Sequence, residues 1–131
     1  MAMGLWISVG GGIGAMARFA LSGWVTTWAY AGFPWATFLV NVSGSFLLGF
    51  LHRALPPATA SPRARGFLTI GLCGGYTTFS TFDFETFSLL NEGRYALAAT
   101  YSLGSVATCI AGVFIGIGIA ASIAGRRAPR R

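Results

Sequence analysis

Apolar residues fill four long stretches of the chain, and short polar connections separate them. The stretches run approximately over residues 5–28, 34–54, 66–90 and 95–124. Each is long enough to cross the hydrocarbon layer of a membrane as a helix, which takes about 20 residues. The pattern predicts an all-α membrane protein. Residues 1–131 form a single domain of four transmembrane helices with both termini on one side, and residues 125–131 form a basic tail.

The third stretch carries an unusual interruption near its midpoint. Gly74 and Gly75 weaken a helix, and four hydroxyl residues follow within six positions: Thr77, Thr78, Ser80 and Thr81. Unsatisfied polar groups at membrane depth are costly, so such a break is tolerated only where it is buried in protein or lines a cavity. We therefore expect a third helix that is broken at mid-membrane, where discontinuous helices build ion sites.

Polar residues also occur inside the other stretches. Asn41 lies in the middle of the second, on a stripe with Thr37, Ser45 and Gly49 at spacing four. Its amide needs a partner, either in another helix or in an ion path. Tyr101, Ser105 and Cys109 form a line at the same spacing in the fourth stretch.

Arg18 is the only charged residue in the first stretch. Two interpretations stay open for it. The side chain either snorkels to the membrane interface or faces a water-filled vestibule, where a fixed positive charge attracts anions.

Small residues predict close helix contacts. Gly10 and Gly14 form a G-x-x-x-G pair, which lets another helix approach the first stretch closely. Four helices of this length cannot enclose a wide pore and also bury their polar stripes. We therefore expect an oligomer, most simply a two-fold symmetric dimer.

Composition supports a membrane environment. Hydrophobic residues make up 54% of the chain and charged residues 9%, with a mean hydropathy of +0.66. A soluble core of this size could not hide so much apolar surface. Both cysteines, Cys73 and Cys109, lie inside apolar stretches and are expected to be reduced packing residues.

The net charge of +6 is distributed in the pattern of a membrane protein and not of a nucleic-acid-binding one. On the side of the termini we expect seven arginines: Arg53, Arg63, Arg65, Arg126, Arg127, Arg130 and Arg131. The other side holds Arg94, and Arg18 if that side chain reaches the interface. This bias favours termini in the cytoplasm.

At the segment GGYTTFSTF the chain resembles the Fluc/CrcB family of small fluoride channels. The resemblance extends over nearly the whole chain, through the glycine-rich first stretch with Arg18, the segment FPWATFLVN and the polar line of the fourth stretch. It implies a channel of the cell inner membrane that exports fluoride passively and confers fluoride resistance. It further implies an antiparallel, dual-topology dimer with two pores and one central structural Na⁺.

The resemblance also assigns roles to residues. The fluoride pathway would use Asn41, Phe79, Phe82, Ser80, Thr81, Tyr101, Ser105, Arg18 and Glu85. The backbone carbonyls of Gly74 and Thr77 would hold Na⁺. Cys109 departs from the pattern, because a hydroxyl residue is usual there. The partner would be a second copy or, given the arginine bias, an oppositely oriented paralogue.

The chemistry of these residues suits fluoride. The ion is small and strongly hydrated, so a pore must replace its water with hydrogen-bond donors that carry no fixed charge, such as amides and hydroxyls. The quadrupole of an aromatic ring makes its edge positive, so Phe79 and Phe82 could face an anion edge-on. Ordinary packing is the alternative interpretation of this pair.

Two other functions fit the sequence less well. A small four-helix drug/proton antiporter needs a buried carboxylate in the first stretch, and residues 5–28 contain no acidic residue. A non-transporting assembly subunit would explain Asn41 and the glycines but not the Thr/Phe cluster. The sequence offers no nucleophile–base pair or metal cluster, so an enzyme is not expected.

Overall fold

The structure, a computed structural model, describes residues 2–29 and 32–127, and the regular elements in these ranges are all helical. In chain order they are α1 (Ala2–Thr26), α2 (Trp35–Ala54), α3 (Pro62–Arg65), the π-helix η1 (Gly66–Cys73), α4 (Gly74–Tyr76), α5 (Phe79–Asn91) and α6 (Tyr95–Arg127). The predicted all-α class is confirmed.

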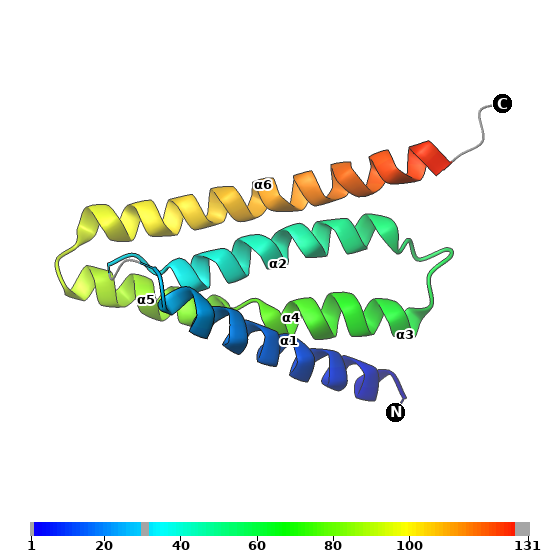
Figure 1. Ribbon diagram of the computed structural model, residues 1–131, viewed down its shortest axis with the longest axis horizontal. Coiled ribbons are helices and arrows are strands. Elements are labelled where there is room, and N and C mark those ends of the chain that lie inside the picture. The colour runs from blue at the N-terminus through cyan, green and yellow to red at the C-terminus, as the bar shows by residue number, and fades with distance from the viewer. Residues whose placement is uncertain (1, 30–31, 128–131) are drawn as a thin grey trace.

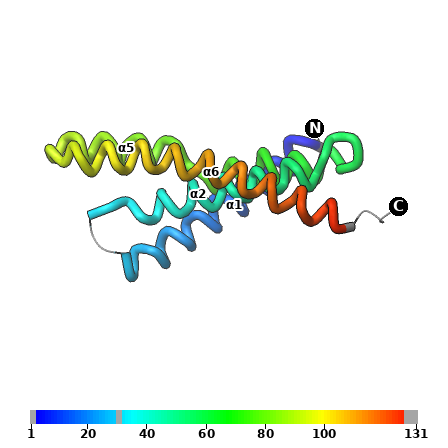
Figure 2. The backbone as a smooth tube through the Cα atoms, turned by 90° about the horizontal axis from the view of Figure 1, so that it is seen from above, coloured from blue at the N-terminus to red at the C-terminus, as the bar shows by residue number. Residues whose placement is uncertain are grey.

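The helices lie lengthwise in one elongated bundle (Figure 1). α6 packs mainly on α2, whereas α1 packs mainly on η1 and α4. The segments α3, η1, α4 and α5 follow one another end to end. Both ends of the described chain and the α2–α3 connection lie at one end of the bundle, and the α5–α6 turn lies at the opposite end. Toward that opposite end, α1 and α2 diverge from α5 and α6 (Figure 2).

The surface of the bundle is strongly apolar. Three helices are long and apolar enough to cross a membrane: Met3–Thr26, Trp35–Ala54 and Tyr95–Arg126. Large side chains such as Met16, Phe19 and Phe114 are 74%, 82% and 69% exposed. Water would not tolerate so much contiguous apolar surface, so the chain is an integral membrane protein.

The helical path over residues 62–91 is interrupted at Thr77 and Thr78. Their backbones are extended, with φ/ψ of −78°/159° for Thr77 and −147°/120° for Thr78. Gly74 and Gly75 are helical, so the expectation that the glycines themselves form part of the break was wrong. Their lack of a side chain serves packing instead: a Cβ on Gly75 would overlap the carbonyl oxygen of Gly11 in α1.

Glycines set the contact between α1 and the η1–α4 segment. A Cβ on Gly10 or Gly14 would overlap the carbonyl oxygens of Phe67 and Leu72, respectively. On the facing segment, a Cβ on Gly71 would lie 2.6 Å from the Ile7 carbonyl oxygen. Backbone therefore packs directly on backbone, as the G-x-x-x-G pair predicted. That prediction is confirmed.

A buried aromatic cluster joins α2, α5 and α6 near the α5–α6 turn. Tyr101 is fully buried beside Leu89 and Ala98. The ring of Phe33 meets the ring of Tyr101 edge to face at a centroid distance of 5.4 Å, and Phe82 lies 5.2 Å from Tyr101 on another side. This cluster fixes the position of the Tyr101 hydroxyl.

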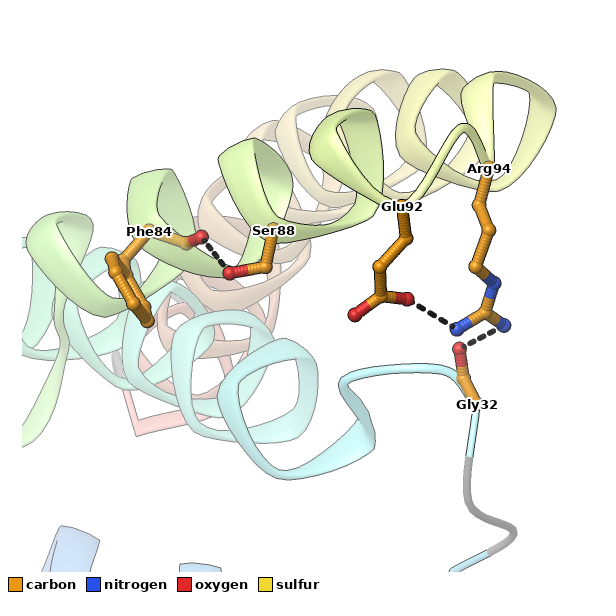
Figure 3. Close-up of polar contacts among 5 residues, drawn as sticks. All are labelled: Gly32, Phe84, Ser88, Glu92 and Arg94. Carbon is orange, nitrogen blue, oxygen red and sulfur yellow. Dashed lines mark hydrogen bonds and ion pairs between the residues drawn. The ribbon is translucent and has the colours of Figure 1, made fainter.

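A charged residue ties two connections together at the same end. Arg94 donates from Nη2 to the carbonyl oxygen of Gly32 at 2.8 Å, and its Nη1 lies 3.4 Å from Oε2 of Glu92 (Figure 3). Nearby, Ser88 donates to the Phe84 carbonyl oxygen of its own helix at 2.9 Å. The α5–α6 turn is therefore fastened to the α1–α2 connection.

The glycine contact can be tested with a matched pair of substitutions. Gly14→Ala is expected to destabilise the protein by about 1–3 kcal/mol, because the new methyl group would force backbone apart. Gly12→Ala is the control, because nothing lies within 4 Å of a Cβ there. Thermal unfolding in detergent micelles measures both. Equal midpoints for the two variants would contradict the packing role.

Candidate functional site

The side chain of Asn41 spans the interruption between α4 and α5. Its Nδ2 donates to the Thr78 carbonyl oxygen at 3.0 Å, and its Oδ1 accepts from the Thr78 N–H at 2.9 Å. One amide side chain in α2 thus satisfies both polar groups of a residue that leaves the helix. This is the interhelical partner that the mid-span amide required.

Thr78 also caps the helix that follows. Its Oγ1 accepts from the Thr81 N–H at 3.3 Å and lies 3.1 Å from the Thr81 hydroxyl. Threonine is a favoured residue at the start of a helix because its hydroxyl replaces a missing carbonyl partner. The hydroxyl of Thr77 turns the other way and donates to the Cys73 carbonyl oxygen at 2.9 Å.

These bonds leave two carbonyls without their usual helical donors. In a continuous α-helix, the Gly74 and Thr77 carbonyls would accept from the N–H groups of Thr78 and Thr81, four residues later. Those N–H groups instead donate to Asn41 and to the Thr78 hydroxyl. Both predicted Na⁺-binding carbonyls therefore lie where the helical ladder is broken.

Glu85 forms the centre of a second polar contact. Its Oε2 accepts from the Tyr101 hydroxyl at 2.6 Å, and its Oε1 accepts from the Thr37 hydroxyl at 2.8 Å. One carboxylate in α5 thus binds donors from α2 and α6. In this arrangement the proton of Tyr101 is engaged by Glu85, so Tyr101 positions the carboxylate.

A cavity of about 400 Å³ lies beside the interruption. Its walls come from α2, η1, α4, α5, α6 and the two extended residues between α4 and α5. They are formed by Asn41, Gly44, Ser45, Leu48, Thr69, Cys73, Gly74, Thr77, Thr78, Phe79, Phe82, Ser105, Val106, Cys109 and Ile110. We call it the phenylalanine cavity. It brings together six of the predicted site residues: Asn41, Gly74, Thr77, Phe79, Phe82 and Ser105.

Two features of the phenylalanine cavity bear on its chemistry. The rings of Phe79 and Phe82 are tilted by 44° at a centroid distance of 5.8 Å. Ser105 is only 4% exposed, and its Oγ has no hydrogen-bond partner among the described residues. A buried hydroxyl without a protein partner on a cavity wall can donate a hydrogen bond to a ligand in that cavity.

A second cavity has a volume of about 520 Å³ and shares Thr78 with the first. It is lined by Ala15, Arg18, Phe19, Ser22, Thr37, Val40, Thr78, Ser80 and Thr81. We call it the arginine cavity. The predicted residues Arg18, Ser80 and Thr81 therefore meet in one space, and Thr78 lines both cavities. Glu85 and Tyr101 are linked to the arginine cavity through Thr37.

Sequence reasoning missed some of the residues at this site. Thr37 was placed on the polar stripe of α2 but received no role, although it lies one helical turn before Asn41 on the same face. Thr78 was counted only as a hydroxyl residue, whereas its backbone is what Asn41 binds. In the part of the chain that the structure describes, no three His, Cys, Asp or Glu residues are grouped as metal ligands.

Comparison with known proteins gives a consistent result. A family model described as "CrcB-like protein, Camphor Resistance (CrcB)" matches residues 5–117. A protein of Geotalea uraniireducens named "Fluoride-specific ion channel FluC" is 43% identical over 120 residues, which cover 91% of this chain and 97% of that protein. A protein of the same name from Geobacter sulfurreducens is 46% identical over 112 residues, which cover 85% of this chain and 90% of that protein. Another protein of this name, from Thermus thermophilus, is 38% identical over 121 residues, which cover 92% of this chain and 95% of that protein.

The contact between Asn41 and Thr78 gives a stability prediction. Asn41→Leu would leave the Thr78 N–H and carbonyl unpaired in the protein interior, at about 1–3 kcal/mol for each group. We expect a loss of roughly 2–6 kcal/mol in unfolding free energy, measured by denaturation in mixed micelles.

Thr100→Ala is the control, because that exposed hydroxyl donates only to the Ala96 carbonyl of its own helix. If Asn41→Leu were as stable as Thr100→Ala, the amide would not hold the interruption together.

Proposed function

This chain belongs to the CrcB-like family, and from that premise we propose that it is a fluoride-selective channel through which the ion leaves the cell passively. The protein is not an enzyme. The observation that carries the proposal is the phenylalanine cavity, where amide, hydroxyl and phenylalanine side chains meet in one small space. Passive export from the cytoplasm would require the channel to lie in the cell inner membrane.

The cavity suits a small, strongly hydrated anion. The Asn41 amide has two N–H groups, and one donates to Thr78, so the second can serve an ion. The unpaired Ser105 hydroxyl lies on the same wall, and the edges of the Phe79 and Phe82 rings supply weak positive potential. None of these groups carries a fixed charge. Each therefore binds weakly enough to release the ion, as conduction requires.

The arginine cavity would serve as a vestibule. Arg18 is half-buried and lines it together with the hydroxyls of Ser80 and Thr81, which favours the vestibule interpretation over simple snorkelling. A positive charge in a low-dielectric cleft raises the local concentration of anions. Fluoride would gather there and then pass Thr78 toward the phenylalanine cavity.

The assembly we propose is an antiparallel dimer with two pores. Residues 62–91 serve as a third, broken span beside α1, α2 and α6, which gives four spans per subunit. Phe79 is 76% exposed although it lines the phenylalanine cavity, so a partner subunit would complete that wall. The partner is a second copy inserted in the opposite direction, or an oppositely oriented paralogue.

We also propose a structural Na⁺ at the centre of the dimer. The Gly74 and Thr77 carbonyls fit this role, because the N–H groups that would pair with them are engaged elsewhere. Unpaired carbonyls at membrane depth are costly, and a small cation satisfies them. When bound, the ion would supply positive charge, and the Gly74 and Thr77 carbonyls of each subunit would hold it.

The channel function is tested by reconstitution in liposomes with a fluoride-selective electrode. We expect passive fluoride efflux and no comparable efflux of chloride. Phe82→Ile should slow fluoride efflux by about tenfold, a barrier increase of about 1.4 kcal/mol, because isoleucine offers no positive ring edge to the ion.

Phe114→Ile is the matched control, because that side chain is 69% exposed on α6. Equal chloride efflux, or no fluoride efflux at all, would reject the channel. Equal rates for the two variants would make Phe82 a packing residue.

The Na⁺ site is tested by exchanging the cation. In a large excess of Na⁺ over its dissociation constant, for example 100-fold, the native dimer should gain about 2.7 kcal/mol of stability. We expect a higher unfolding midpoint in Na⁺ than in K⁺ at equal ionic strength, measured in detergent. Equal unfolding midpoints in the two salts would show that the dimer has no Na⁺-selective site.

A further inference from the structure

Both cysteines of the chain line the phenylalanine cavity. Cys73 comes from η1 and Cys109 from α6, and both are free thiols. Packing alone does not explain why both cysteines line the same cavity. It also does not explain why Cys109 continues the polar line that Tyr101 and Ser105 form at spacing four on α6. A thiol on the wall of a small space can react, in its thiolate form, with a reagent that enters that space.

The two thiols differ in access. Cys73 is 1% exposed, whereas Cys109 is partly exposed. Cys109 also lies one helical turn after Ser105, whose buried hydroxyl has no partner in the described ranges. The neighbours of Cys109 on α6 that share the cavity wall, Val106 and Ile110, are apolar. The wall next to Cys109 is therefore apolar on both sides of the thiol, which suits contact with a small uncharged reagent.

We propose that Cys109 is a covalent modification site for small uncharged sulfenyl donors, and that its modification obstructs the phenylalanine cavity. The effect on transport rests on the proposed function, whereas the modification itself does not. In this chain, a thiol at this position makes the proposed fluoride path sensitive to thiol-reactive compounds.

Methyl methanethiosulfonate is the probe for this chemistry. The Cys109 sulfur, after losing its proton to buffer, attacks the sulfenyl sulfur of the reagent. A new S–S bond forms, the S–S bond of the reagent breaks, and methanesulfinate leaves with the electron pair. The product carries one methylthio group, which a dithiol removes by exchange, with release of methanethiol.

The methylthio group would hinder fluoride in two ways, because it fills part of the cavity and because it is apolar. It extends an apolar substituent into the cavity that Ser105 and Phe82 also line. An anion that has lost part of its hydration shell would meet a methyl group where it needs donors. Fluoride efflux should therefore fall while the fold is kept.

The experiment compares the wild type, Cys109→Ser, Cys73→Ser and the double variant in liposomes, each with and without the reagent. Each variant is compared with its own rate before treatment. Intact-mass measurement reports the number of methylthio groups, and a fluoride electrode reports efflux.

We expect treated wild type and Cys73→Ser to lose fluoride efflux by about tenfold or more, a barrier increase of at least about 1.4 kcal/mol, and dithiothreitol to restore it. Cys109→Ser and the double variant should keep their own rates. A positional control adds Leu103→Cys, 73% exposed on α6, to the double variant. It should gain the methylthio group and keep its rate.

Other outcomes overturn the proposal. An unmodified Cys109 would show that the reagent does not reach the thiol. A modified Cys109 with unchanged efflux would show that the group does not obstruct the path, and equal block of Cys109→Ser would assign the effect to another residue. Absence of efflux before treatment would instead reject the proposed function, while the mass measurement would still decide the modification.

Discussion

The pair of hydrogen bonds between Asn41 and the Thr78 peptide is the interaction on which the rest of the site depends. A chain that leaves helical geometry inside a membrane must satisfy each exposed N–H and carbonyl internally. Asn41 satisfies both groups of Thr78 at once, at 2.9 and 3.0 Å. Because that peptide is held from α2, the Thr78 side chain can cap α5, and the Phe79–Phe82 pair then begins in a defined direction.

Close packing by glycine supports the same arrangement from the other side. Backbone-to-backbone contact between α1 and the η1–α4 segment holds the chain just before the interruption. After the interruption, the Glu85 carboxylate joins α5 to Thr37 and Tyr101. The two extended residues thus lie between a close backbone contact on one side and a carboxylate that accepts bonds from two other helices on the other.

Sequence patterns predicted the parts of this structure that depend on local composition. Hydropathy predicted the helical class, and the spacing of Gly10 and Gly14 predicted their contact. The predicted break in the third stretch included Gly74 and Gly75, because intrinsic preference identifies glycine as the weak point of a helix. In the structure the hydrogen bonds from Asn41 to Thr78 confine the break to Thr77 and Thr78. Periodicity put Thr37 and Asn41 on one face. It could not say that one binds Glu85 and the other Thr78, since those pairings depend on the rotation of α5 against α2.

The two extended residues have an electrostatic consequence that needs no ionised side chain. Peptide dipoles add along a helix to about half an elementary charge at each end, positive at the N-terminus and negative at the C-terminus. The interruption ends one helical segment at Tyr76 and starts another at Phe79, so ends of opposite partial charge face each other across Thr77 and Thr78. An anion near the start of α5 and a cation near the carbonyls that close α4 are both stabilised by backbone alone. Two ions of opposite sign can therefore be attracted to one depth of the membrane without either being bound tightly by a formal charge.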